Sequence, residues 1–491
     1  MTTIKYEAAM CYLRGLCYAQ QNSYDRAKEC YKDAVLIDVQ CFEAFEQLMK
    51  NQLLSPEEEW QFLESLDFDS MSSTSSASSQ EAAEFVKMLY LTRLSKYKNA
   101  AMFQGAAETL STHYKLNNNP DLELSKAQLL YTQCRFRAAL DLTNSIISSD
   151  RWNFNVYPLH LACLYELHST NALFLIAHDL ADLHPNEPCA WLAVGTYYLS
   201  VHNITEARRY FSKASMMDAA FGPAWIGFAH TFAEEGEHDQ AVSAYSTAAR
   251  LFMGSHLPQL FLGMQNLLLG NNTLAEEYLR TAHSLCATDP LLLNELGVVA
   301  YNQSELPQAV TYLSAALDAA SSIGAPQTAW LSTRANLGHA LRRLCRFDEA
   351  LECFEEVLRL GGRDAQIFCA KGLCLMEMGQ PWLAVRALHE ALAVESQDGV
   401  ATELLGDALK ECTKDGVGLE AAADIEIGFG GEIGRDDSRF VDDAWEERFE
   451  GEMMGRLDMA RVAAEQTAMN RKLGNAWSRR AAAGDDAGGD V

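Results

Sequence analysis

A small residue returns at a fixed interval of 34 residues through the centre of this chain, which has 491 residues in all. The interval is kept over four positions, and it resumes for three more after an insertion of seven residues. An interval of this length predicts an internal repeat that is built from one supersecondary unit. The positions are Gly195, Ala229, Gly263, Gly297, Gly338, Gly372 and Gly406.

Two further columns keep the same register. Alanines stand twelve residues after the small residues, and large apolar residues stand sixteen after them. Several columns in one register indicate the tetratricopeptide unit, which is a pair of antiparallel helices. The columns are Ala207, Ala241, Ala275, Ala309, Ala350 and Ala384, and Phe211, Tyr245, Leu279, Leu313, Phe354 and Leu388.

The columns have a mechanical explanation. Trp191, Gly195 and Tyr198 share one face of a first helix, and Ala207 and Phe211 share one face of a second. The small residues let the two backbones approach closely, while the large side chains fill the volume beside the contact. One such pair buries too little apolar surface to be stable, so the pairs must stack. The sequence therefore predicts an all-α, right-handed superhelical solenoid of antiparallel helix pairs.

The repeat also predicts how the chain is divided. N-terminal repeats occupy 1–68, a Ser-rich disordered loop 69–80, the main repeat array 81–412, and an acidic tail rich in Gly, Ala and Asp 413–491. The template gives about nine or ten units, and it leaves the register open over 49–122.

Two segments interrupt the array. The serine run is either a phosphorylation loop or a tolerated insertion between helices, and the insertion is favoured because serine runs are common in loops. The tail carries one predicted amphipathic helix near 443–464, which either docks on a partner or caps the open end of the solenoid. Its apolar stripe is Trp445, Phe449, Met453, Leu457, Ala460 and Ala464.

Charge and composition exclude several function classes. The net charge of −28 and the lack of a basic stripe argue against nucleic acid as a ligand. Thirteen cysteines are scattered without a CxxC pair, which favours a reducing compartment, and no apolar run is long enough to cross a membrane. We therefore expect a protein of the nucleus and cytoplasm.

A search for catalytic motifs finds none. The chain has no HExxH and no phosphate-binding GxxxxGK[ST] sequence. His230 lies close to Glu234 on a predicted helix, but such pairs on a repeat scaffold are usually polar contacts without a chemical role. We expect no catalytic residue, no cofactor and no metal.

A solenoid instead offers the wall of its inner groove. Positions one residue after the Trp/Gly/Tyr face are rotated by about 100° and face that wall. The wall is mainly apolar with polar groups at intervals, which suits an extended peptide, although each residue has an equal chance of packing against the next repeat. The predicted partner groove is Ile226, His230, Leu260, Met264, Asn294, Val298, Tyr301, Asn336, His339, Arg342 and Met376.

Several strings go beyond the generic repeat columns. They resemble the cell-division-cycle-sixteen family of subunits of the anaphase-promoting complex, or cyclosome, over about residues 5 to 410. The strings are KYEAAMCYLRG (5–15), CFEAFEQL (41–48), EARRYFSKASMMD (206–218), FGPAWIGFAHTFAEEGEHDQA (221–241), GSHLP (254–258), ELGVVAYNQ (295–303) and NLGHALRRL (336–344).

The resemblance implies a non-catalytic scaffold subunit of a multisubunit ubiquitin ligase that controls mitotic progression. It also implies a homodimer formed through N-terminal repeats, and a small, mostly disordered subunit held in the groove of the C-terminal repeats. Several N-terminal repeats of that family have no counterpart in this sequence, so the homodimer is an expectation by analogy alone. The serine insert and the acidic tail have no counterpart either.

A second function class does not depend on the resemblance. Tetratricopeptide repeats also serve as adaptors or cochaperones, whose clamps capture C-terminal carboxylates with Lys, Arg and Asn. The predicted wall here is mainly apolar, which disfavours this alternative.

Overall fold

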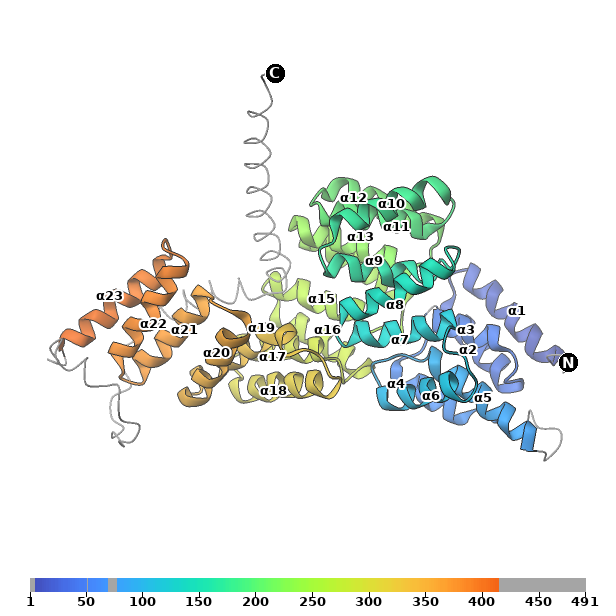
Figure 1. The fold of residues 1–491 in the computed structure, drawn as a ribbon, viewed down its shortest axis with the longest axis horizontal. Coiled ribbons are helices and arrows are strands. Elements are labelled where there is room, and N and C mark those ends of the chain that lie inside the picture. Colours follow the sequence, from blue (N-terminus) through green and yellow to red (C-terminus); the bar gives the residue numbers. More distant parts are fainter. Residues whose placement is uncertain (1–4, 51, 69–76, 415–491) are drawn as a thin grey trace, which may run out of the picture. The chain divides into compact units, whose positions relative to one another are not determined.

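The computed structural model describes residues 5–50, 52–68 and 77–414, in which every regular element is a helix (Figure 1). The helices alternate as the first and second members of successive pairs. The first members are α1 (Tyr6–Gln20), α3 (Phe42–Lys50), α5 (Ala77–Arg93), α7 (Pro120–Thr132), α9 (Tyr157–Glu166), α11 (Pro188–Ser200), α13 (Gly222–Glu235), α15 (Leu257–Leu268), α17 (Pro290–Asn302), α19 (Leu331–Arg343), α21 (Ala365–Glu377) and the unpaired α23 (Gly399–Lys414). The second members are α2 (Tyr24–Ile37), α4 (Pro56–Ser65), α6 (Ala100–Thr112), α8 (Phe136–Ser149), α10 (Thr170–Leu183), α12 (Ile204–Met217), α14 (His238–Leu251), α16 (Asn272–Leu285), α18 (Leu306–Ser322), α20 (Phe347–Gly361) and α22 (Pro381–Val394), and a short 3₁₀ helix, Gln327–Trp330, precedes α19.

The described chain therefore holds eleven pairs and one further helix, more than the nine or ten units expected. The excess comes from α4, α5 and α6, which fill the stretch whose register the sequence left open. The predicted disordered loop 69–80 ends too late, because Ala77–Gln80 already belong to α5. Residues 69–76 and the predicted tail helix near 443–464 lie outside the described residues.

The chain divides into two compact units. Unit 1 contains residues up to Val299 together with Ala315–Ala329, and unit 2 contains Ala300–Ser314 and the chain from Trp330 onward. The boundary between the units runs through α17 and α18, within the predicted array 81–412, and the N-terminal repeats belong to unit 1.

The close contact predicted between the two helices of a pair is confirmed. A Cβ atom added to Gly195 would lie 2.7 Å from the Phe211 ring, and one added to Gly263 would lie 2.5 Å from Leu279. Gly338 faces Phe354 in the same way, at 2.7 Å. In each pair the glycine meets the residue sixteen positions later, and the alanine column is fully buried. In each of these glycine-containing pairs, the two helices can approach closely because the glycine has no side chain.

The turn inside each pair uses a left-handed backbone. Positive φ angles recur at the start of this turn, at 34-residue intervals over much of the chain. Most of the residues concerned are not glycine, although a side chain is costly in this conformation. The turn residues are Asn22, Gln52, Cys134, His168, His202, Gly236, Gly270, Ser304, Cys345 and Gly379.

A seam joins parts of unit 1 that are far apart in the sequence. The amide N–H of Gly254 donates to the Gln52 carbonyl oxygen at 2.9 Å, and a Cβ atom on Gly254 would lie 2.6 Å from that oxygen. The Thr288 hydroxyl donates to the Tyr97 carbonyl at 2.9 Å, at a sequence separation of 191. The turns inside early pairs thus contact the connections between later pairs.

Two further contacts belong to the seam. The Tyr97 ring packs edge-on against the His256 ring at 4.8 Å, and the buried His256 Nε2 lies 2.8 Å from Asp289 Oδ2. The Arg135 guanidinium donates to the carbonyl of Gly324 at 3.0 Å, across 189 residues. The Tyr97–Thr288 and Arg135–Gly324 pairs are 191 and 189 positions apart, so the seam advances through successive repeats.

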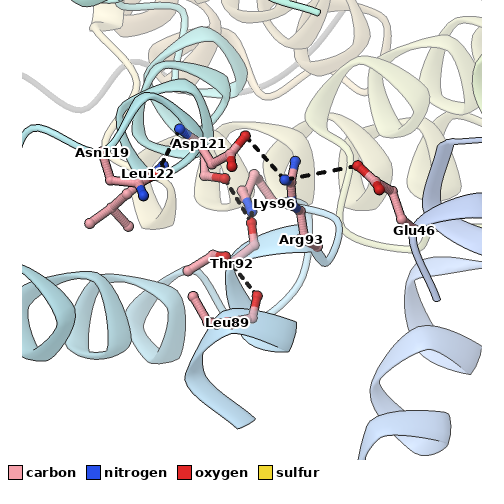
Figure 2. Close-up of polar contacts among 9 residues, drawn as sticks. Glu46, Leu89, Thr92, Arg93, Lys96, Asn119, Asp121 and Leu122 are labelled. Carbon is pink, nitrogen blue, oxygen red and sulfur yellow. Dashed lines mark hydrogen bonds and ion pairs between the residues drawn. The ribbon is translucent and has the colours of Figure 1, made fainter. Parts of the chain in front are cut away.

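A polar cluster holds the α5–α6 connection that supplies Tyr97 (Figure 2). Arg93 forms an ion pair with Asp121 at 3.1 Å, and the buried Lys96 ammonium donates to the Thr92 carbonyl at 2.6 Å. Burial lowers the pKa of Lys96 to about 7, while Glu59 opposes the shift. The Ser95 N–H donates to Glu59 at 2.7 Å, which ties the connection to α4.

The helix-pair contact makes a prediction at Gly263. A Gly263→Leu variant should lower the free energy of unfolding by about 1–3 kcal/mol, because the new side chain overpacks the contact with Leu279. Thermal unfolding followed by circular dichroism measures the change. Gly105→Leu is the matched control, since no described atom lies within 4 Å of a Cβ there. Equal melting of Gly263→Leu and the parent would contradict the role of the glycine column.

The seam makes a separate prediction at Gly254. A Gly254→Ala variant should destabilise unit 1, because the added methyl group meets backbone atoms of Gln52 and Leu54 that cannot move aside like a side-chain end. Amide hydrogen exchange should then increase in the 52–55 and 253–256 connections before it increases elsewhere. Gly222→Ala is the control, since its methyl group would make only an ordinary contact with Phe252. Protection that stays at the parental level would show that the seam adds no stability.

Candidate partner-binding surface

The predicted groove residues all lie on first members of helix pairs. Most of them are buried, and only Ile226, His230 and Met376 are half-buried. Ile226 through Val298 belong to unit 1, and Tyr301 through Met376 belong to unit 2. The set by helix is Ile226 and His230 on α13, Leu260 and Met264 on α15, Asn294, Val298 and Tyr301 on α17, Asn336, His339 and Arg342 on α19, and Met376 on α21.

In unit 1 this surface is mainly apolar around one histidine. The His230 ring packs edge-on against Phe261 at 4.9 Å, and its Nδ1 atom pairs with the Tyr245 hydroxyl. Burial lowers the pKa of His230 to about 4, so the ring is neutral near pH 7. Its neighbours Leu260 and Met264 on α15 are buried. A neutral imidazole among apolar groups provides a hydrogen-bonding group without a net charge.

Asn294 introduces a polar group on α17. It is buried, and its side-chain amide donates to Glu295 Oε1 at 2.9 Å. Glu295 is itself buried. Buried polar groups need hydrogen-bond partners, and these two side chains provide one for each other.

In unit 2 the predicted groove residues include a buried arginine, Arg342. Arg342 is 1% exposed, and its Nη1 atom donates to Glu377 Oε1 at 2.8 Å. The next residue, Arg343, lies over the Tyr301 ring at 4.8 Å. His339 contacts the Phe354 ring edge-on at 5.1 Å, and Asn336 stands one helical turn before it. Asn336, His339 and Arg342 thus form a polar row at three-residue spacing on α19.

The described residues also limit what the surface can do chemically. They include no group of three or more His, Cys, Asp or Glu side chains placed to hold a metal ion. Nor does any helix among them have the length and apolarity needed to cross a membrane.

The seam residues could not be predicted from the repeat pattern. Nothing in the 34-residue register connects Gly254 or His256, which lie in the GSHLP string, with residues of the first repeats. The one indication in the sequence is that Gly254 lies outside the glycine column, so it needs another explanation.

Comparison with known proteins begins with the repeat itself. The tetratricopeptide repeat family matches residues 8–40 and 288–363. Among curated proteins, anaphase-promoting complex subunit cut9 of Schizosaccharomyces pombe is 48% identical over 408 residues, which are 83% of this chain and 60% of that protein. Anaphase-promoting complex subunit CDC16 of Saccharomyces cerevisiae is 40% identical, over 83% of this chain and 48% of that protein.

A plant relative is covered more completely. Anaphase-promoting complex subunit 6 of Arabidopsis thaliana is 35% identical over 424 residues, which are 84% of this chain and 76% of that protein. The chain belongs to this family of anaphase-promoting complex subunits. The resemblance seen in the sequence is thereby confirmed. The chain spans only 60% and 48% of the length of the two yeast members.

A solved structure from the same family supports the fold. The crystal structure of the APC/C hetero-tetramer Cut9–Hcn1 matches with a TM-score of 0.69 and 47% identity, covering 83% of this chain and 77% of that one. The all-α tetratricopeptide-repeat solenoid is therefore the fold of this family member.

The lowered pKa of His230 predicts a pH effect. Because the folded pKa of about 4 lies below the value of about 6.5 for an unfolded histidine, the unfolded chain binds the proton more readily. The free energy of unfolding therefore does not depend on this titration above about pH 6.5, and it decreases as the pH falls from there toward 4. His230→Phe should flatten the fall of the melting temperature over this window.

The matched control is His389→Phe on α22, where the histidine is exposed. Melting curves at closely spaced pH values measure both variants, and the control should keep the parental slope. An unchanged slope in His230→Phe would mean that the buried ring does not contribute to the acid sensitivity.

Proposed function

We propose that this chain is a non-catalytic scaffold subunit of the anaphase-promoting complex, a multisubunit ubiquitin ligase that controls mitotic progression. The observation that carries the proposal is its 48% identity to cut9 over 408 residues, together with the matching fold. A solenoid suits this role because its stacked repeats present long surfaces to several partners.

Within that role, the α19 surface of unit 2 binds an extended segment of a small subunit. The support is the row of Asn336, His339 and Arg342, which are all buried and all engaged in polar or ring interactions. Asparagine and arginine side chains of this kind pair with peptide groups, while Tyr301 and Met376 supply apolar contact. The related Cut9 chain was solved together with Hcn1, which supports a partner subunit here.

Two further parts of the proposal rest on the family. A second copy of the chain is the expected partner of the N-terminal repeats, since the Cut9–Hcn1 assembly is a hetero-tetramer. We also propose that the protein occurs in the nucleus and cytoplasm, where fluorescence microscopy of the tagged chain can test it.

Affinity purification tests the complex as a whole. The tagged full chain, purified from its own cells at moderate salt, should carry the cullin, RING and repeat subunits of the ligase in constant proportions. Mass spectrometry identifies them. Recovery of chaperones in place of ligase subunits would instead support an adaptor or cochaperone and overturn the scaffold proposal.

An asparagine variant tests the small-subunit surface. Asn336→Ala should weaken binding of the co-purifying small subunit by about tenfold, because a buried peptide group loses its partner. Isothermal titration calorimetry measures this, and the melting temperature checks folding. Asn171→Ala, at an exposed position on α10, is the control and should bind like the parent. Equal affinity in both variants would remove Asn336 from the binding surface.

A further inference from the structure

The outward face of α10 carries an unusual set of side chains. Leu175 and Leu183 are both 63% exposed, and Phe174 is exposed beside them. Leu175 and Leu183 lie on the side of α10 that faces away from Leu173, Ala177 and Leu180, which are buried in the repeat core. Phe174 lies at the edge of this side, half a turn around the helix from Leu183. Single exposed apolar residues are common, but several on one helix face indicate a docking surface.

A neighbouring loop extends this face with an aromatic group. Trp152 is 69% exposed, and its ring packs edge-on against His184, the residue that follows α10, at 4.5 Å. Phe154 supports the same His184 ring at 5.1 Å. The Asp150 carboxylate accepts the Trp152 backbone N–H at 2.9 Å, and the Tyr157 hydroxyl donates to the Arg151 carbonyl at 3.1 Å. The loop is thus held in place while its indole remains exposed.

The charge around these apolar groups is mostly negative. Asp179 and Asp182 are exposed on the same face of α10, and Asp150 lies in the Trp152 loop. Arg151 provides a positive charge in that loop, and His178 lies 3.5 Å from Asp182. A segment that combines apolar side chains with lysine or arginine would complement this surface.

The preceding second helix, α8, has a different exposed face. Its exposed side chains are mainly polar, which is the usual state of a solvated helix face. The polar ones are Arg137, Asp141, Asn144, Ser145, Ser148 and Ser149.

We propose that the outward face of α10 and Trp152 form a second docking surface, which binds a basic, apolar segment of a partner protein. The surface lies within unit 1 and is separate from the α19 row in unit 2. The partner's apolar side chains cover Leu175, Leu183 and the Trp152 indole, whose wide flat ring is typical of interface centres. Its lysine or arginine side chains meet Asp179 and Asp182.

Photo-cross-linking in cells tests the surface with the full chain. A benzoylphenylalanine placed at position 175 should form an adduct with one partner peptide that contains several lysines or arginines and apolar residues. The same group at Ser145 on α8 is the control and should give no adduct with that peptide. Mass spectrometry of the adduct identifies the peptide and its charge.

A charge variant then tests the carboxylates. In the chain labelled at position 175, the double change Asp179→Asn and Asp182→Asn should reduce the adduct about fivefold. Asp141→Asn on α8 is the control and should leave the adduct unchanged. The melting temperature of each variant shows that a lost adduct does not come from unfolding.

The outcomes separate this inference from the scaffold proposal. No adduct at position 175, an adduct with an acidic peptide, or an adduct only with a second copy of this chain would overturn the docking surface. Co-purified ligase subunits are scored independently in the same cells. A basic adduct without the ligase supports the surface and contradicts the scaffold role, whereas the ligase without an adduct does the reverse.

Discussion

The structure depends on the contact between a glycine backbone and one large side chain. At Gly195, Gly263 and Gly338 a single added methyl group would lie within 2.7 Å of the partner side chain, so the distance between the two helices is set by the absence of a side chain. The partners, from Phe211 to Leu388, are in turn almost fully buried. Because the pairs that carry this glycine obey the same constraint, they stack on their neighbours in a similar way.

The seam adds a second constraint that a simple stack of repeats does not have. In a quasi-one-dimensional array each repeat contacts only its neighbours, and the total stability is a sum of contributions from single repeats and from the interfaces between neighbours. In unit 1 the Gly254 amide instead donates to the Gln52 carbonyl, and the Tyr97 carbonyl accepts from Thr288, 191 positions later. Backbone groups make several of these bonds, so they fix the relative position of early and late repeats more firmly than surface ion pairs would. Unit 1 therefore behaves as one body in which distant repeats support each other.

The sequence predicted the features that recur and missed those that do not. The small and large columns were visible because packing repeats every 34 residues, and the helix-pair contact followed from them. The turn column was missed because Cys134, His202 and Ser304 hold the left-handed conformation as well as Gly236 does, so residue type gives no signal. The seam was missed because it joins positions that no periodicity relates. For the predicted partner groove, the sequence placed the residues on the first helices of the pairs, but the burial of Arg342 and its bond to Glu377 depend on tertiary packing.

The negative charge of the chain bears on which partners its proposed α10 and α19 surfaces can bind. The chain has 67 acidic and 39 basic residues, and many of its arginines are already paired with carboxylates between helices. Arg208 pairs with Glu235, Arg334 with Glu356, and Arg363 with Glu390. These paired cations stabilise the stack, and the excess of acidic over basic residues favours basic partners. An acidic solenoid with a few local apolar faces can therefore discriminate between partners: charge attracts a basic segment, and only a segment that also covers an apolar face, such as that of α10, stays bound.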